Sequence, residues 1–315
     1  MERCRNLRGG PSPRPGFGIV AVQFREPAMR FVLLTAAMLA APAAAQNDAP
    51  IVVIGQRDIE QQIESFVGAL TPASPRGQIA RFEAAVCPGA FGIPDAQRDT
   101  VRDRIRAVAK EVGLDVAAPG CKPNLLVVVT ADKTSFIKAL GKDHSYMFGD
   151  RTPTQIRKII AEPGPSAAWQ IQTMVNADGR PISNEADMPI NRSTRTPSRI
   201  TAAARPAFMA AVVVVENKAL DGLTTTQLAD YAAMRALARI EPARIDAAAP
   251  ETILRILDAA ADSEVPVTLT QWDFGFLKGL YSSPNNLYAP SQRSEIGRVI
   301  EQEMDRSDGG AAPRR

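Results

Sequence analysis

Runs of apolar and polar residues along the chain predict an α+β protein. Apolar residues that recur every three or four positions indicate one buried face of a helix. This spacing predicts helices over 57–70, 77–86, 101–112, 132–141, 152–160, 223–239, 250–260, 270–281 and 291–304. Short apolar runs rich in Val or Ile predict strands, because β-branched side chains fit a pleated surface. Such runs lie at 51–54, 125–130, 169–175 and 211–215.

The strand patterns differ in how they alternate. The runs 125–130 and 211–215 contain almost no polar positions, which indicates strands buried on both faces. The run 169–175 alternates with polar residues, so we expect it to be half exposed, and Asp178-Gly179 indicates a turn after it. Together these patterns predict a small mixed sheet of about four strands with helices packed over it.

No linker-like composition divides the chain, so we expect residues 46–304 to form a single α+β domain. A helical N-terminal subdomain over 56–120 is the alternative. Residues 305–315 are rich in charge and glycine and predict a disordered tail.

The residues before this domain carry the pattern of a secretory signal peptide. Arg30 supplies a positive charge, 31–41 is a short apolar run, and Ala43–Ala45 offers a small-residue cleavage site. A transmembrane helix needs about 20 apolar residues, so this run is too short to span a membrane. We therefore expect residues 29–45 to be removed, the mature protein to begin near Gln46, and its location to be periplasmic or secreted.

Removal of the leader changes the charge of the chain. The full chain has a net charge of +3, and residues 1–45 hold six Arg and two Glu. The remainder has 31 Lys and Arg against 32 Asp and Glu, a net charge of −1. A near-neutral chain has no electrostatic basis for binding nucleic acid. Residues 1–28, rich in Arg, Gly and Pro, are interpreted as a mis-assigned translation start or a disordered extension.

An exported chain folds in an oxidising compartment, where cysteines pair. Two cysteines remain after the leader, Cys87 and Cys121, each beside loop-forming residues, and we predict a disulfide between them. Two buried thiols are the alternative. The chain has no CxxC pair, no phosphate-binding loop and one histidine, His144, in a polar segment. Gly164-Pro165-Ser166 lacks the second glycine of a nucleophile elbow. No cofactor is therefore expected.

The last third of the chain resembles the matrixin-like metzincin metalloproteases. A buried strand at 211–215 leads through Asp221-Gly222 into a helix. The later segment Leu269–Tyr281 has the Leu-Thr start, the Asp and the Leu-Tyr end of the C-terminal helix of these proteases. A family of uncharacterised secreted proteobacterial proteins shares this layout with a decayed metal helix, and the chain resembles it over Leu125–Tyr281. The resemblance implies a zincin-like fold.

The same resemblance places the metal helix of the proteases on residues 231–238. Its HExxH motif supplies two zinc-binding histidines and a general-base glutamate. Here Tyr231 and Arg235 stand at the histidine positions, Ala232 at the glutamate position and Glu241 at the third ligand position. Alanine cannot act as a base, and arginine has no lone pair for a metal. The resemblance therefore implies a pseudoenzyme without zinc.

We expect an exported, non-catalytic protein that binds a peptide or an envelope partner in the former substrate cleft. In that cleft Arg235 is expected to pair with Glu241 and to contact Tyr231, one helical turn away. Three alternatives remain open. The first is a hydrolase that uses carboxylates such as Asp221 or Asp273. The second is a structural component of the envelope. In the third, Tyr231 and Arg235 only line one face of a helix that packs over the sheet.

Overall fold

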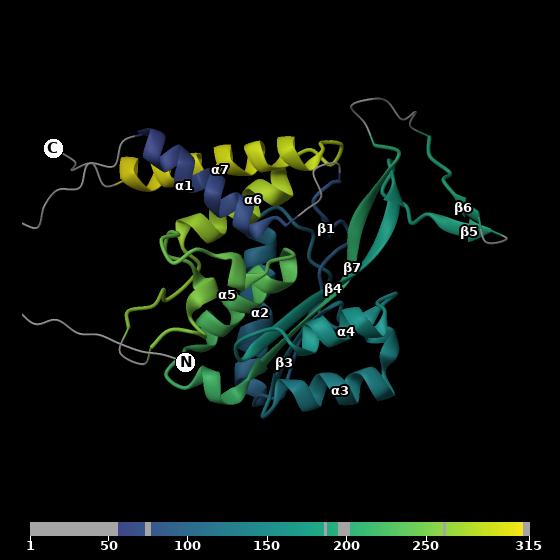
Figure 1. Cartoon of the computed structure of the whole chain (residues 1–315), viewed down its shortest axis with the longest axis horizontal. Helices are drawn as coiled ribbons and strands as arrows, with labels where there is room; N and C mark the ends of the chain where they lie inside the picture. Colours follow the sequence, from purple (N-terminus) through teal and green to yellow (C-terminus); the bar gives the residue numbers. More distant parts are fainter. Residues whose placement is uncertain (1–55, 73–76, 186–187, 195–201, 261–262, 311–315) are drawn as a thin grey trace, which may run out of the picture. The chain divides into compact units, whose positions relative to one another are not determined.

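The computed structural model describes residues 56–72, 77–185, 188–194, 202–260 and 263–310 (Figure 1). The described residues all belong to one compact unit. The predicted leader, the expected mature start at Gln46 and the predicted strand at 51–54 lie outside the described residues.

Seven α-helices and seven strands are formed by the described residues. The helices are α1 (Gln56–Leu70), α2 (Asp95–Glu111), α3 (Lys133–Asp143), α4 (Pro153–Ile160), α5 (Thr225–Leu237), α6 (Gln271–Ser282) and α7 (Ala289–Gly310). The strands are β1 (Arg81–Phe82), β2 (Pro88–Phe91), β3 (Leu125–Thr130), β4 (Ser166–Asn176), β5 (Ser183–Glu185), β6 (Met188–Ile190) and β7 (Ala204–Glu216). Short 3-10 helices are η1 (Ser145–Phe148), η2 (Asn217–Leu220), η3 (Pro242–Arg244) and η4 (Ile253–Arg255).

Strand β7 is the centre of a five-stranded sheet. It pairs antiparallel with β4 along one edge, and on the other edge it pairs in parallel with β3 and, nearer its start, with β1. Strand β2 adds to β3 in parallel. Strands β5 and β6 form a separate two-stranded hairpin. A largely parallel, apolar sheet of this kind needs helices on both faces.

Two groups of helices cover the two faces of the sheet (Figure 1). Helices α3 and α4 pack on one face, where the rings of Phe148 and Trp169 stack with centroids 5.0 Å apart. The remaining helices enclose the larger apolar cluster on the other face. Alternate residues of β7 serve the two faces, because Val212 and Val214 join the first cluster and Val213 the second. The result is a three-layer α/β/α arrangement.

Local sequence signals set several of the element boundaries. Strand β3 covers the predicted run 125–130, which is confirmed. Thr152, Thr224 and Thr270 start α4, α5 and α6 with reciprocal capping boxes, and Asp132 caps α3. Each cap satisfies main-chain N–H groups that have no partner within the helix.

The predicted disulfide between Cys87 and Cys121 is confirmed. The two Cα atoms are 6.1 Å apart, and the bond closes a loop with a sequence separation of 34. It joins the start of β2 to the segment that follows α2, so it ties the outer strand of the sheet to the helix layer.

The helix predicted over 77–86 is wrong. This segment contains β1 and an isolated bridge between Val86 and Val116. The main-chain N–H of Ile79 donates to the side chain of Gln292 in α7, 2.7 Å away. Contacts with β7 and α7 therefore take the main-chain hydrogen bonds that a helix would have made locally.

The helix predicted over 250–260 is also wrong, because only the short η4 forms there. Asp273 accepts a hydrogen bond from the hydroxyl of Thr252 and, at 2.8 Å, from the main-chain N–H of Ile253. The carboxylate from α6 thus holds the backbone of this segment, while Ile253 and Leu254 are buried.

In coarse form the expectation of a mixed sheet with helices over it is confirmed, with five strands in place of four. The strands β4 and β7 both extend beyond the predicted 169–175 and 211–215, since they pair with each other along most of their length. The last helix continues past the predicted end at Met304 to Gly310, into the segment expected to be a disordered tail. Residues 311–315 lie outside the described part of the chain.

Candidate functional site

Helix α5 carries the two residues at the histidine positions of the metzincin resemblance. Every residue from Gln227 to Leu237 is buried, because α5 lies between the sheet and other helices of its layer. Tyr231 and Arg235 lie one turn apart and both contact Ser166 at the start of β4. Arg235 is only 1% exposed, so its charge and its donors need partners inside the protein.

Three side chains meet the guanidinium of Arg235. Its Nη1 donates to the hydroxyl of Tyr231 at 2.8 Å and to that of Ser166 at 3.3 Å, and its Nη2 donates to Glu162. The two hydroxyl oxygens are 2.6 Å apart. We call Glu162, Ser166, Tyr231 and Arg235, together with the neighbouring Lys133, the Arg235 site.

The predicted pairing of Arg235 with Glu241 is wrong. Glu241 is exposed, and the carboxylate comes from Glu162 in the segment between α4 and β4. The end of α5 is held from the sheet, because the side-chain amide of Gln170 donates to the carbonyl oxygens of Arg235 and Ala238 at 2.7 and 3.0 Å. After the helix the chain passes along the rim of the site, where Glu241 lies without an ion pair to Arg235.

Lys133 brings a second cation to the site. Its Nζ donates to the main-chain carbonyl oxygens of Glu162, Gly164 and Ser166. Desolvation lowers the pKa of Lys133, and the nearby Glu162 and Glu216 oppose this shift. The ammonium group thus holds the turn between α4 and β4 in place over the end of α5.

Charged side chains also close the free edge of β4. Alternate residues of this strand turn their main-chain groups away from β7, and three of these groups bond to side chains. The carbonyl oxygens of Ser166 and Gln170 accept from the side chains of Lys133 and Arg151, at 3.0 and 2.7 Å. The main-chain N–H of Ala168 donates to the carboxylate of Glu162 at 3.3 Å. An extended peptide can add to this stretch only if these side chains move.

A cleft of about 680 Å³ opens over the Arg235 site. Its floor includes Tyr231 and Arg235, and its rim carries the exposed side chains of Lys158, Glu241 and Asp258. A cleft of this size with a few convergent polar groups is a common form of binding site. The structure therefore brings all three predicted site residues to one cleft, although Glu241 reaches it from the rim and without contacting Arg235.

Burial determines how the floor of the cleft ionises. Desolvation raises the pKa of Tyr231, so its hydroxyl stays neutral. Desolvation opposes the charge on Arg235, but Tyr231 and Glu162 outweigh it and leave the pKa of the guanidinium raised. A tyrosine with a raised pKa is a poor base for activating Ser166 as a nucleophile. The arrangement offers hydrogen-bond donors and charge.

The two carboxylates of the hydrolase alternative lie elsewhere. Asp221 is exposed at the end of η2, and Asp273 is buried at the start of α6. Both oxygens of Asp273 accept hydrogen bonds, from Thr252, Ile253 and Thr270. Neither carboxylate lines the cleft over the Arg235 site.

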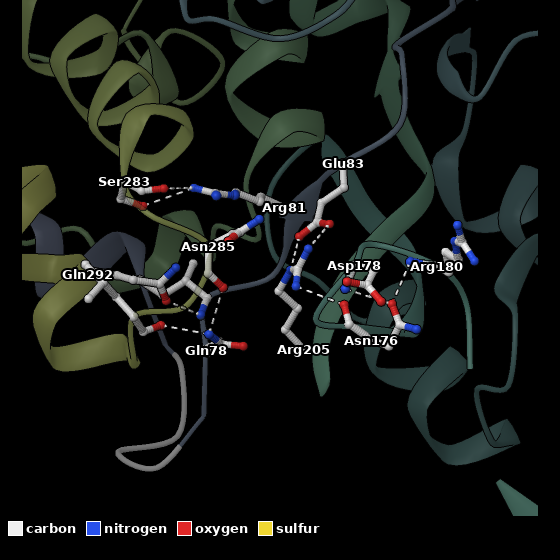
Figure 2. Close-up of polar contacts among 12 residues, drawn as sticks. Gln78, Arg81, Glu83, Asn176, Asp178, Arg180, Arg205, Ser283, Asn285 and Gln292 are labelled. Atoms are coloured by element: carbon white, nitrogen blue, oxygen red, sulfur yellow. Dashed lines mark hydrogen bonds and ion pairs between the residues drawn. The ribbon is translucent and has the colours of Figure 1, made fainter. Parts of the chain in front are cut away.

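A second buried arginine, Arg205, lies at the start of β7, between the end of β4 and the residue that follows β1 (Figure 2). The Nε and Nη2 of Arg205 donate to the two carboxylate oxygens of Glu83, and its Nη1 donates to the carbonyl oxygen of Asn176 at 2.9 Å. The side chain of Asn176 in turn accepts the N–H groups of Asp178 and Arg180, both at 3.0 Å. We call Glu83, Asn176 and Arg205 the Arg205 cluster.

Neighbouring polar contacts tie the same segment to the C-terminal helices (Figure 2). The Nη1 of Arg81 donates to the carbonyl of Ser283 at 2.8 Å and to its hydroxyl at 3.0 Å, and Gln78 donates to the carbonyl of Asn285 at 3.0 Å. These bonds join β1 and the residues just before it to the segment that connects α6 with α7. This region is therefore a structural junction.

Three members of the Arg235 site were missed from the sequence, namely Lys133, Glu162 and Ser166. Glu162 and Ser166 flank Pro163-Gly164-Pro165, which the sequence marks only as the end of a helix. No spacing connects these positions with Arg235, because the contacts join α3, the α4–β4 turn and α5 across the fold.

No protein-family model, curated protein or solved structure matches this chain. Within the described residues, no three His, Cys, Asp or Glu side chains are grouped so that they could hold a metal ion. The side chains at the two ligand positions of the zincin resemblance do not fit zinc, since Arg235 has no lone pair and is bonded to Glu162, Ser166 and Tyr231. None of the described helices combines the length and the apolar character that a membrane crossing requires.

Proposed function

We propose that this chain is an exported, non-catalytic binding protein that holds a segment of a partner protein in the cleft over the Arg235 site. The signal-like pattern at 29–45 and the disulfide between Cys87 and Cys121 support export. A zincin-like architecture is part of the proposal. It is supported by the order of β7, α5 and α6 along the chain, which is the order that the resemblance implies.

One observation carries the binding role. A buried guanidinium and two buried hydroxyls converge with a partly exposed carboxylate at the floor of a cleft of about 680 Å³. Burying such a cluster costs several kcal/mol of desolvation per ion, and apolar side chains would pack α5 on the sheet at lower cost. A binding role gives this cluster a use that packing alone does not.

The closed edge of β4 restricts how a partner segment can bind. Lys133, Glu162 and Arg151 occupy the main-chain groups that a β-strand would need. Recognition in the cleft therefore depends on a side chain or a chain end that enters toward Arg235, and less on strand addition.

A peptide-display selection against the mature protein, residues 46–315, tests the proposal. Selected peptides are measured against wild type and against Ala243→Trp, which fills the cleft from an exposed lining position. Ala96→Trp, exposed in the first turn of α2 and outside this cleft, is the matched control.

Peptides that bind wild type and Ala96→Trp alike, and Ala243→Trp about tenfold more weakly, support the proposed function. The proposal fails if the selection yields no binder, or if every binder is insensitive to Ala243→Trp. Export is tested separately by N-terminal sequencing of the protein from the exported fraction. A mature start within a few residues of Gln46 is expected, and retention of the full-length chain in the cytoplasm contradicts it.

A further inference from the structure

The guanidinium of Arg235 is only partly used, in contrast to two other arginines of the chain. Arg104 donates from Nε and Nη2 to the two oxygens of Asp230, at 2.6 and 3.1 Å, and Arg205 does the same with Glu83. Arg235 reaches its carboxylate through Nη2 alone. Its Nε is buried and has no hydrogen-bond partner among the described residues.

The carboxylate of Glu162 explains this difference, because it serves two partners. One oxygen accepts from Nη2 of Arg235, and the other accepts from the main-chain N–H of Ala168 at 3.3 Å. Glu162 therefore cannot lie side-on against Nε and Nη2, which is the geometry that a carboxylate prefers with arginine.

The two hydroxyls of the site leave a second donor unused. Ser166 and Tyr231 each accept from Arg235, and one hydrogen bond joins them to each other. That bond uses one of their two hydroxyl hydrogens. The other has no acceptor within the described part of the chain. The unbonded N–H groups of Arg235 and this hydroxyl hydrogen are all donors, so an acceptor on the ligand complements them.

The unused Nε of Arg235 belongs to a charged guanidinium, which bonds an anionic acceptor more strongly than a neutral one. Lys133 and Arg235 are two cations, and Glu162 is the one carboxylate that bonds to Arg235. Glu216 accepts the main-chain N–H of Lys133, but its own charge is paired with Lys218 at 3.0 Å. At the buried floor these two cations face one carboxylate, whereas the exposed rim adds Glu241 and Asp258 against Lys158, so the lining as a whole has no net positive charge.

Building on the proposed function, we propose that the cleft recognises a carboxylate of its partner and that Glu162 is an internal competitor for Arg235. A ligand carboxylate that lies side-on to Nε and Nη2 makes two charge-assisted hydrogen bonds where Glu162 makes one. Glu162, with a side chain already 21% exposed, turns outward to solvent. The N–H of Ala168 is then free for a carbonyl oxygen of the bound segment.

Calorimetric titration of short N-acetylated alanine peptides tests this competition. One peptide has a free C-terminal carboxylate, the second is amidated, and the third is amidated and has a glutamate as its last residue. Each is titrated into wild type and into Glu162→Gln, which removes the competing charge and keeps the size of the side chain. The free-acid peptide is expected to bind Glu162→Gln about tenfold more tightly than wild type. The amidated peptide without glutamate is expected to show no gain.

Two further variants keep the test decisive. Glu241→Gln removes a carboxylate from the rim of the same cleft without touching Arg235, and a change below about twofold is expected. Glu162→Asp keeps the charge but shortens the side chain, so an intermediate gain is expected, and it replaces Glu162→Gln if circular dichroism shows that variant to be unfolded. The third peptide shows which carboxylate the cleft recognises. If a glutamate side chain can replace the C-terminal carboxylate, this peptide also binds Glu162→Gln more tightly than wild type.

Three results overturn the proposal. They are equal affinities for the free-acid and amidated peptides, weaker binding by Glu162→Gln than by wild type, and no binding of the free-acid peptide to any of these proteins. Display-selected peptides that bind in the cleft without a carboxylate overturn the competition by Glu162 and leave the proposed function intact. Failure of the display selection itself instead removes the cleft as a protein-binding site.

Discussion

The Arg205 cluster and the Arg235 site both bury an arginine against a glutamate, and they differ in how completely the arginine is bonded. Arg205 uses all three of its nitrogens, two of them on Glu83 and one on a main-chain carbonyl. Arg235 bonds Glu162 through one nitrogen and leaves its Nε without a partner among the described residues. A saturated guanidinium stabilises a junction of the fold, whereas a partly used one can accept a ligand.

The surroundings of the two arginines differ in the same sense. The turn after β4 closes over the Arg205 cluster, where Gly179 adopts the left-handed conformation with φ 80°. A Cβ atom on Gly179 would lie 3.5 Å from Glu83 and 3.6 Å from Arg205, so no ligand-sized space remains on that side. Arg235 instead lies at the floor of a cleft of about 680 Å³.

The largest expected loss of stability follows from breaking the Arg205 cluster. Glu83→Leu is expected to lower the free energy of unfolding by about 3–5 kcal/mol, because it leaves a buried guanidinium unpaired. The double variant with Arg205→Met is expected to recover most of this loss. Urea unfolding measures the free energy of unfolding of both variants. Glu185→Leu, which breaks the exposed ion pair with Arg192, is the control, and it is expected to lower this free energy by under about 1 kcal/mol. Additive losses in the double variant would contradict a coupled pair.

Removal of the disulfide by substitution tests whether the difference between the two arginines is local. Replacing Cys87 and Cys121 by serine is expected to cost about 3–4 kcal/mol, since the unfolded chain regains the freedom of the closed loop. The coupling energy between Arg205 and Glu83, measured by double-mutant cycles, is expected to stay unchanged in this background. A large change would mean that the disulfide sets the geometry of the distant pair.

A smaller effect is expected at the Arg235 site. Glu162→Gln is expected to lower the free energy of unfolding by about 1–2 kcal/mol, because one charged hydrogen bond is replaced and the amide oxygen can still accept. Urea unfolding of Glu83→Gln under the same conditions gives the direct comparison, with a larger loss expected where two bonds are affected. The reverse order would show that Glu162, and not Glu83, belongs to a saturated junction.

The smallest expected effect is the alkaline pH dependence of the Arg235 site. Burial raises the pKa of Tyr231, so its stabilising contribution is complete below the unfolded value near 10 and is lost as pH rises toward the folded value. At pH 10.5 wild type is expected to lose up to about 1 kcal/mol that Tyr231→Phe does not lose. Urea unfolding at pH 8 and pH 10.5 measures the difference, and Tyr146→Phe, at a side chain 71% exposed, is the control. An equal pH dependence in wild type and Tyr231→Phe would contradict the raised pKa.

Several features of this protein follow from the sequence alone. The apolar run at 125–130 determines β3, and threonine followed three residues later by a glutamine or an aspartate determines where α4, α5 and α6 begin. The two cysteines that lie outside the predicted leader, together with the expected export, indicate the disulfide. These features depend on residues that are close in sequence or on a simple count, so tertiary context does not change them.

The tertiary structure decided the secondary structure of the segments at 77–86 and 250–260. It also decided which carboxylate pairs with Arg235. In both segments the helical spacing is present, but side chains or strands from elsewhere in the chain take up the main-chain hydrogen bonds. Position 162 is far from position 235 in sequence, and the fold brings them together because β4 pairs with β7 and places its start beside α5. A buried charge finds its partner through space, so the identity of that partner, and the nitrogen of Arg235 that stays unused, depend on how the layers pack.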